Sequence, residues 1–89
     1  MADAIRLRVL TDTGVALDEE AVSIRAPGEI GYLGILRHHA PLVTTLSPGK
    51  LTWRRADGHS LTRRLDGGFL EVLRNRVTIL AQSFDEATA

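Results

Sequence analysis

The fold is decided by residues 27–49, PGEIGYLGILRHHAPLVTTLSPG, a stretch that begins and ends with a Pro-Gly pair. Gly31 and Gly34 lie between these pairs, and both residue types shape the backbone, because proline fixes φ and glycine reaches positive φ at little cost. The stretch is also too rich in leucine, isoleucine and valine to be a disordered linker. We therefore expect short strands joined by tight corners, and no helix, in this part of the chain.

The sequence on either side alternates with the period of a β-strand. Ile5, Leu7 and Val9 alternate with arginines, which is typical of a strand with one buried face. Comparable segments lead us to expect strands at residues 5–10, 15–17, 21–26, 32–36, 42–46, 50–55, 60–65, 69–73 and 77–81.

Turn-forming residues separate these segments, and Asp57 with Gly58 is the strongest hairpin signal. Gly28 suits the positive-φ position of a type II turn after Pro27. Further corners are expected at Pro48-Gly49, Asp66-Gly67-Gly68 and Arg74-Asn75.

Regularly spaced strands without a helical period predict an all-β fold, a small β-sandwich of about eight to ten short, mostly antiparallel strands with no substantial helix. The length of 89 residues predicts one domain, 1–89, with its core at about 4–82. Residues 83–89 are expected to form a polar tail with helical character, too short to be stable alone.

The composition excludes several classes of function. Eleven Lys and Arg residues balance eleven Asp and Glu residues, and there is no cysteine. A neutral chain has no strong electrostatic attraction to nucleic acid or anionic lipid, and cysteine metal sites are ruled out. No apolar run approaches the ~18 residues of a membrane span, and the N-terminus does not read as a signal peptide. We expect a soluble protein that meets a membrane only indirectly, through a partner.

No catalytic, cofactor or metal site is expected. His38 and His39 are adjacent and would point to opposite faces of a strand, and no cysteine or suitably spaced carboxylate completes a ligand set. The serines lack a nucleophile elbow, and the carboxylates of Glu29, Asp66 and Glu71 are isolated in sequence. The glycines of 28–34 fit neither a dinucleotide fingerprint nor a P-loop, because no helix follows them.

One binding function remains as the alternative. The arginine pairs 54–55 and 63–64 face each other across the hairpin at Asp57, next to Trp53. A basic surface with an aromatic side chain is the kind of platform on which OB-folds stack single-stranded bases. The alternative function is therefore an OB-like single-stranded nucleic-acid-binding module, although a solvated hairpin with splayed charges explains the same residues.

Two blocks of the sequence resemble a known family. The first is PGEIGYLGIL followed by HAPL, a leucine and PG within 27–49; the second is GGFLEV at 67–72 followed by NRVTILA at 75–81. Both resemble the epsilon subunit of F-type ATP synthases, which is called delta in mitochondria. The resemblance runs in order over about residues 5–81, nearly the whole chain.

The resemblance implies a β-sandwich at the foot of the central stalk, where it packs against the gamma subunit and rests on the membrane rotor ring. It implies a non-catalytic rotor subunit that couples ion-driven rotation to ATP synthesis, with no cofactor and no nucleic-acid partner. The implied location is the cytoplasmic face of the cell membrane, as a peripheral part of the complex.

The resemblance also suggests contact residues. It places the rotor-ring contact at Gly28, Glu29, Ile30, Gly31, Tyr32, His38 and His39, and the gamma contact at Leu42, Thr44, Gly68 and Phe69. We expect the corner at residues 38–41 to lie beside the glycine loop. The family commonly has an acidic residue where Tyr32 stands, so Glu29 is the candidate for a charge pair with the ring.

The usual bacterial subunit continues into a C-terminal helical hairpin that can inhibit ATP hydrolysis. The sequence ends at Ala89, before such a hairpin. Whether Ala89 is the natural end or a truncation stays open, and we expect no inhibition of this kind from these residues.

Overall fold

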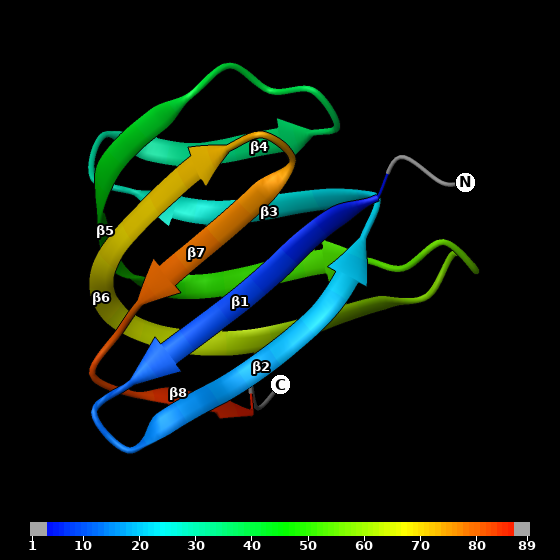
Figure 1. Ribbon diagram of the computed structural model, residues 1–89. Coiled ribbons are helices and arrows are strands. Elements are labelled where there is room, and N and C mark those ends of the chain that lie inside the picture. The colour runs from blue at the N-terminus through cyan, green and yellow to red at the C-terminus, as the bar shows by residue number, and fades with distance from the viewer. Residues whose placement is uncertain (1–3, 87–89) are drawn as a thin grey trace.

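The computed structural model describes residues 4–86, and every regular element in this range is a strand. The strands are β1 (Ile5–Thr11), β2 (Gly14–Ala21), β3 (Ser23–Gly28), β4 (Gly31–Leu36), β5 (Leu42–Arg54), β6 (Ser60–Leu73), β7 (Arg76–Leu80) and β8 (Phe84–Glu86). The predicted all-β class is confirmed (Figure 1). Residues 4–86 contain no helix that is long and apolar enough to cross a membrane.

One long hairpin connects the two layers of the sandwich. β5 and β6 stay paired in a single antiparallel register, from Leu42 opposite Val72 to Arg54 opposite Ser60, and both curve from one layer into the other (Figure 1). The first layer contains β2, β1, β7 and the adjoining halves of β6 and β5. The second contains β4, β3, the other halves of β5 and β6, and β8.

The hairpin bends where the sequence predicts corners. Gly67 and Gly68 have φ values of 110° and 138° in β6, and Pro48 lies in β5 opposite Asp66. These corners are bends inside continuous strands, so the separate strands expected at 42–46 and 50–55 are one strand, as are those at 60–65 and 69–73. A side chain at Gly68 would collide with the carbonyl oxygen of Leu80, so glycine allows β6 to approach β7 closely.

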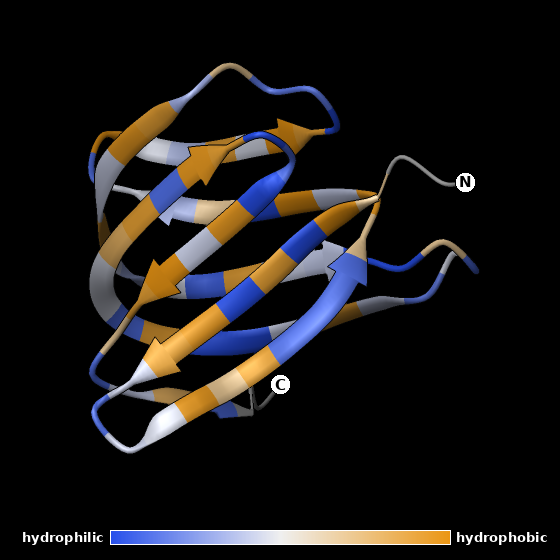
Figure 2. Ribbon diagram, in the orientation of Figure 1, coloured by the Kyte–Doolittle hydropathy of each residue, from blue (hydrophilic) through white to orange (hydrophobic). Residues whose placement is uncertain are grey.

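The core is aliphatic apart from one tryptophan. Hydrophilic and hydrophobic residues alternate along β1, so that one face of the strand supplies the core (Figure 2). The side chains that form the core are Ile5, Leu7, Val9, Ala21, Ile24, Ala26, Ile35, Leu46, Leu51, Trp53, Leu65, Leu70, Val72, Val77, Ile79 and Ala81.

The end of the chain differs from the prediction. Helical character was expected from residue 83 onward, but Phe84–Glu86 forms β8 and pairs with β6. The physical reason is Phe84, whose ring stacks on Trp53 with 6.4 Å between the ring centroids. Packing against the core therefore outweighs the weak local preference for helix, and residues 87–89 lie outside the described part of the chain.

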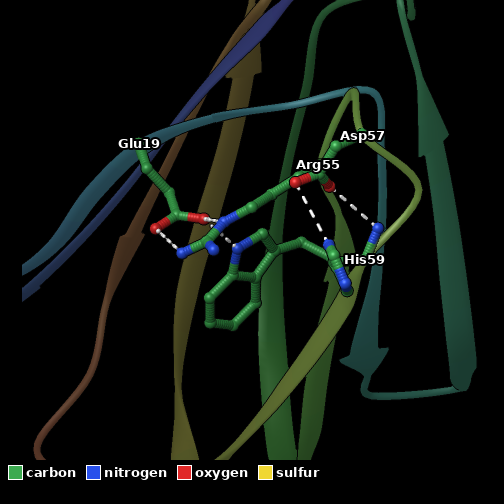
Figure 3. Close-up of polar contacts among 5 residues, drawn as sticks. Glu19, Arg55, Asp57 and His59 are labelled. Atoms are coloured by element: carbon green, nitrogen blue, oxygen red, sulfur yellow. Dashed lines mark hydrogen bonds and ion pairs between the residues drawn. The ribbon is translucent and has the colours of Figure 1, made fainter.

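A carboxylate from the first layer holds the tryptophan of the second. Glu19 of β2 accepts a hydrogen bond of 2.6 Å from the indole N–H of Trp53 in β5. It also accepts bonds of 2.8 and 2.9 Å from the guanidinium of Arg55 (Figure 3). These bonds, led by those from Arg55, lower the pKa of Glu19. The charged form of Glu19 therefore stabilises the contact between the layers.

The bend in β6 can be tested with a single methyl group. We expect Gly68→Ala to lower the free energy of unfolding by at least about 2 kcal/mol, because alanine meets both a positive φ and the Leu80 carbonyl. Urea unfolding monitored by tryptophan fluorescence measures this change. The matched control is Gly34→Ala in β4, where an added Cβ meets nothing within 4 Å. Equal stability of the two variants would contradict this role of Gly68.

The Glu19 contact predicts a pH dependence. A lowered pKa in the folded state means that the contribution of Glu19 is complete above its ordinary pKa of 4.5, declines below it, and is lost as the pH falls through the lowered pKa of the folded state. We expect Glu19→Gln to cost about 1–2 kcal/mol at pH 7 and progressively less as the pH is lowered below 4.5, in urea unfolding at a series of pH values. Glu20→Gln, an exposed neighbour on β2, should change stability by less than about 0.5 kcal/mol. A cost for Glu19→Gln that is independent of pH would be evidence against the contact.

Candidate functional site

The turn between β3 and β4 projects from the end of the second layer. Gly28 pairs with Gly31, and Glu29 with Ile30 makes the two-residue connection. The side chain of Ile30 is fully exposed. Gly31, with φ of 144°, takes the positive-φ position that was expected at Gly28, so that detail of the prediction is wrong. Gly28 is needed instead for space, since an added Cβ would lie 2.7 Å from the Gly31 carbonyl oxygen.

Tyr32 ties this turn to the bend of β5. The β3–β5 ladder is interrupted between Arg25 and Gly28, next to Pro27, which has no N–H. In this gap the Tyr32 hydroxyl accepts a hydrogen bond of 3.2 Å from the backbone N–H of Lys50. The Arg25 guanidinium lies 4.8 Å from the centre of the Tyr32 ring. Tyr32 thus braces the sandwich.

The acidic side chain of the turn is also held in place. Glu29 accepts a hydrogen bond of 2.6 Å from the hydroxyl of Thr45 in β5. Glu29 remains exposed to solvent. The structure therefore places a positioned carboxylate beside the exposed side chain of Ile30.

The histidine corner lies at the other end of β4. His38, with φ of 66°, donates its backbone N–H to the side-chain oxygen of Asn75 at 2.6 Å. The N–H of His39 reaches the Leu36 carbonyl at 3.2 Å. Six residues of strand separate this corner from the glycine turn, about 20 Å at ~3.3 Å per residue. The expectation that the two corners lie side by side is wrong, because the corner docks on the β6–β7 turn.

The four residues expected to contact gamma have different environments. Leu42 and Thr44 alternate on β5 with Leu46, which is buried, so their side chains face the interior. Gly68 packs against β7. Phe69, which is about half exposed, is the large apolar side chain of this set on the outer surface.

Phe69 belongs to an apolar row across the outer face of the first layer. It pairs with Leu80 of β7, which pairs with Leu10 of β1, which in turn pairs with Val15 of β2. Phe69, Leu80 and Val15 are each at least half exposed, and a hollow lined by Thr45, Gly68, Phe69 and Leu80 adjoins the row. We call Phe69, Leu80, Leu10 and Val15 the apolar row. In the sequence, the sign of this row is that apolar residues occupy positions that the alternation of the strands directs outward.

The arginines of the β5–β6 hairpin do not form a stacking platform. Trp53 is 1% exposed and cannot stack on a base. Arg55 is held by Glu19, and Arg63 lies over the Trp53 ring. Arg54 and Arg64 are left on the outer face of the second layer, where Arg64 lies opposite Asp85 of β8. The arrangement required by the nucleic-acid-binding alternative is therefore absent from this hairpin.

The loop of the same hairpin is closed by its own polar groups. Asp57 accepts a hydrogen bond of 2.9 Å from the backbone N–H of His59, and its other oxygen lies 3.1 Å from the His59 ring (Figure 3). The backbone bond is the main reason that the pKa of Asp57 is lowered. Within residues 4–86, no three His, Cys, Asp or Glu side chains converge on a point where a metal ion could bind.

Known proteins with a similar sequence are subunits of ATP synthases. A family model described as ATP synthase, delta/epsilon chain, β-sandwich domain matches residues 4–87. The ATP synthase epsilon chain of Herpetosiphon aurantiacus is 45% identical over 83 residues, covering 93% of this chain and 60% of that relative. The epsilon chain of Moorella thermoacetica is 40% identical over 84 residues, covering 94% and 63%. The chain thus spans about three-fifths of the length of these relatives.

Solved structures share the fold. A chain in the cryo-EM structure of the Euglena gracilis mitochondrial ATP synthase (OSCP, F1 and c-ring) has a TM-score of 0.88 at 24% identity, covering 94% of this chain and 54% of that chain. A chain in the Tetrahymena thermophila mitochondrial ATP synthase (central stalk and c-ring) has a TM-score of 0.77 at 19% identity, covering 92% and 66%. Because the family model spans nearly all of the sequence, this chain belongs to the family of ATP synthase delta and epsilon chain β-sandwich domains.

Proposed function

We propose that this sandwich is the part of a central-stalk subunit that joins gamma to the membrane rotor ring of an F-type ATP synthase. In this role it carries ion-driven rotation toward the catalytic head and performs no chemistry of its own. It would act at the cytoplasmic face of the cell membrane, as a peripheral part of the complex. The observation that carries the proposal is the family match over residues 4–87, together with relatives that are ATP synthase epsilon chains.

The architecture suits a part that transmits torque. β5 and β6 run through both layers as one paired unit, so a force on one layer reaches the other through covalent chain and ladder hydrogen bonds. The close-packed core resists deformation. A load applied at one end of the sandwich would therefore move the whole sandwich.

The apolar row is the surface that we propose for gamma. Its outward side chains expose apolar area that gains free energy when water is removed from it. Phe69, proposed for gamma from the resemblance, is one end of this row. Gly68 supports it from behind by letting β6 approach β7, whereas Leu42 and Thr44 face the interior of the sandwich and are not part of this surface.

The turn between β3 and β4 is the surface that we propose for the ring. Ile30 offers an exposed apolar tip, and Glu29 offers a carboxylate held by Thr45. Gly28, Gly31 and Tyr32 shape and brace the turn. We confine the ring contact to this end of β4, because His38 and His39 lie at the far end of the strand.

The gamma surface predicts a loss of binding. We expect the double variant Phe69→Asp, Leu80→Asp to bind the purified gamma subunit of the same synthase at least tenfold more weakly, since two apolar side chains would be replaced by charges. A tenfold change corresponds to about 1.4 kcal/mol, within the gain from burying one such side chain. Calorimetric titration measures the affinity. Leu36→Asp, at an exposed apolar position on the other layer, is the control and should bind normally; equal loss in both would refute the assignment.

The ring surface predicts a loss of coupling without a loss of gamma binding. In the assembled synthase, we expect Ile30→Asp to lower ion-driven ATP synthesis severalfold, because it places a second carboxylate beside Glu29 at the ring contact. ATP synthesis in energised membrane vesicles and ATP hydrolysis by the detached head should be compared. Leu36→Asp, an exposed substitution at the far end of β4 and outside the apolar row, is the control and should leave synthesis unchanged. If Ile30→Asp leaves synthesis unchanged in complexes that contain it, the turn does not contact the ring.

A further inference from the structure

β4 is a free edge of the sandwich. It is the last strand in the sheet order and pairs with β3 alone. Pro27 lies opposite Tyr32 and has no backbone N–H to donate, so Pro27 and Tyr32 form a non-hydrogen-bonded pair of this antiparallel ladder. Non-hydrogen-bonded pairs occur at every second residue, so Arg25 and Gly34 form another such pair. The backbone N–H and C=O groups of Tyr32 and Gly34 therefore point away from β3. These groups are available to an additional strand.

This edge lacks the usual protection against pairing. Edge strands of natural proteins are commonly blocked by charged side chains, proline or bulges. The opposite edge, β2, follows this pattern with Asp18, Glu19 and Glu20. The sequence of β4, GYLGIL, has no charge and no proline.

A basic hollow lies on the outer face beside this edge. It is lined by residues from β3, β4, β5 and β6, among them Arg25, Gly34, Arg54 and Ser60. Gly34 opens the hollow, since a Cβ added there would meet nothing within 4 Å.

The two cations that line this hollow, Arg25 and Arg54, have no ion-pair partner within residues 4–86. In the described residues, no carboxylate lies within ion-pair distance of Arg25, Arg54, Lys50 or Arg64, all on the outer face of the second layer. On the outer face of the first layer, by contrast, Asp18 pairs with Arg6 and lies 3.6 Å from Arg8. Arg64 lies opposite Asp85 of β8, so the positive charge without a nearby carboxylate is gathered at Arg25 and Arg54, beside the edge of β4.

We propose that β4 accepts, as an added strand, an extended segment of a partner polypeptide whose outward side chains are acidic. A strand beside β4 would lie about 9–10 Å from β3, two strand spacings away. An acidic side chain opposite Gly34 has no side chain between itself and the guanidinium of Arg25. Apolar side chains on the other face of the segment would continue the row of Leu33 and Ile35. Main-chain bonds would give affinity, and the arginines would select for acid. The proposal does not rest on the function proposed above.

The probe is a peptide of about eight residues in which Glu alternates with Val. The control peptide has Lys in place of every Glu. NMR titration of the 89-residue chain measures binding and amide exchange. We expect the Glu peptide to bind at least tenfold more tightly than the Lys peptide. We also expect it to slow the exchange of the amides of Tyr32 and Gly34. Arg25→Glu with Arg54→Glu should reverse the preference, whereas Arg76→Glu, on the outer face of the first layer, should leave it unchanged.

Each other outcome overturns the proposal. Absence of binding at ~1 mM peptide, a concentration at which even a contact with a Kd of about 1 mM is detected, removes the proposal. If the peptide binds but does not slow hydrogen exchange at the amides of Tyr32 and Gly34, the contact is ionic and strand addition is excluded. Protection that rises with protein concentration without peptide assigns the edge to a second copy, whose acidic β2 would be the incoming strand. Tighter binding to vesicles of anionic phosphatidylglycerol than to the peptide assigns the face to lipid.

Discussion

The structure depends on one backbone constraint, the bend that carries the β5–β6 hairpin from one layer into the other. At this bend Gly67 and Gly68 adopt positive φ, and Gly68 lies so close to the Leu80 carbonyl that a side chain would collide with it. Because the register of β5 and β6 is unbroken across the bend, the positions of the two layers are coupled. The interlayer contacts of Glu19 with Trp53 and Arg55 follow from that arrangement.

The sequence predicts this fold well where the physics is local. Alternation along β1 and the turn at Arg74 and Asn75, both with positive φ, follow from residue type and spacing. It fails where long-range packing decides. The sequence predicts a strand end at Pro48, but this residue lies within β5. It predicts helical character around Phe84, but the ring of Phe84 packs on Trp53 and its segment forms β8.

The candidate surfaces are likewise predicted from the sequence where they depend on local residues, and not where they depend on how the strands are arranged. The motif at 27–49 identifies the glycine turn, but the position of the histidine corner depends on which way β4 runs and on the bond from His38 to Asn75. The apolar row joins residues from β6, β7, β1 and β2, so it appears only when the strand order is known. Its members look like core residues in the sequence.

Alternation gives each layer one inner and one outer face, and the two outer faces differ in chemistry. That of the first layer combines the apolar row with paired charges such as Arg6 with Asp18. That of the second layer has Arg25 over the Tyr32 ring and Arg25 with Arg54 around a hollow, and it ends at the uncharged edge of β4. A chain with such surfaces can carry distinct partners on them, because contacts at one face leave the others free.

The central claim is that the apolar row and the glycine turn are the two attachment surfaces of a rotor part. A cryo-EM structure of the assembled synthase containing this chain tests it most directly. The account predicts that gamma covers Phe69 and Leu80 and that ring loops contact Ile30 while His38 lies away from the ring. A map in which the apolar row faces solvent, or in which the ring meets the histidine corner instead of the turn, would contradict it.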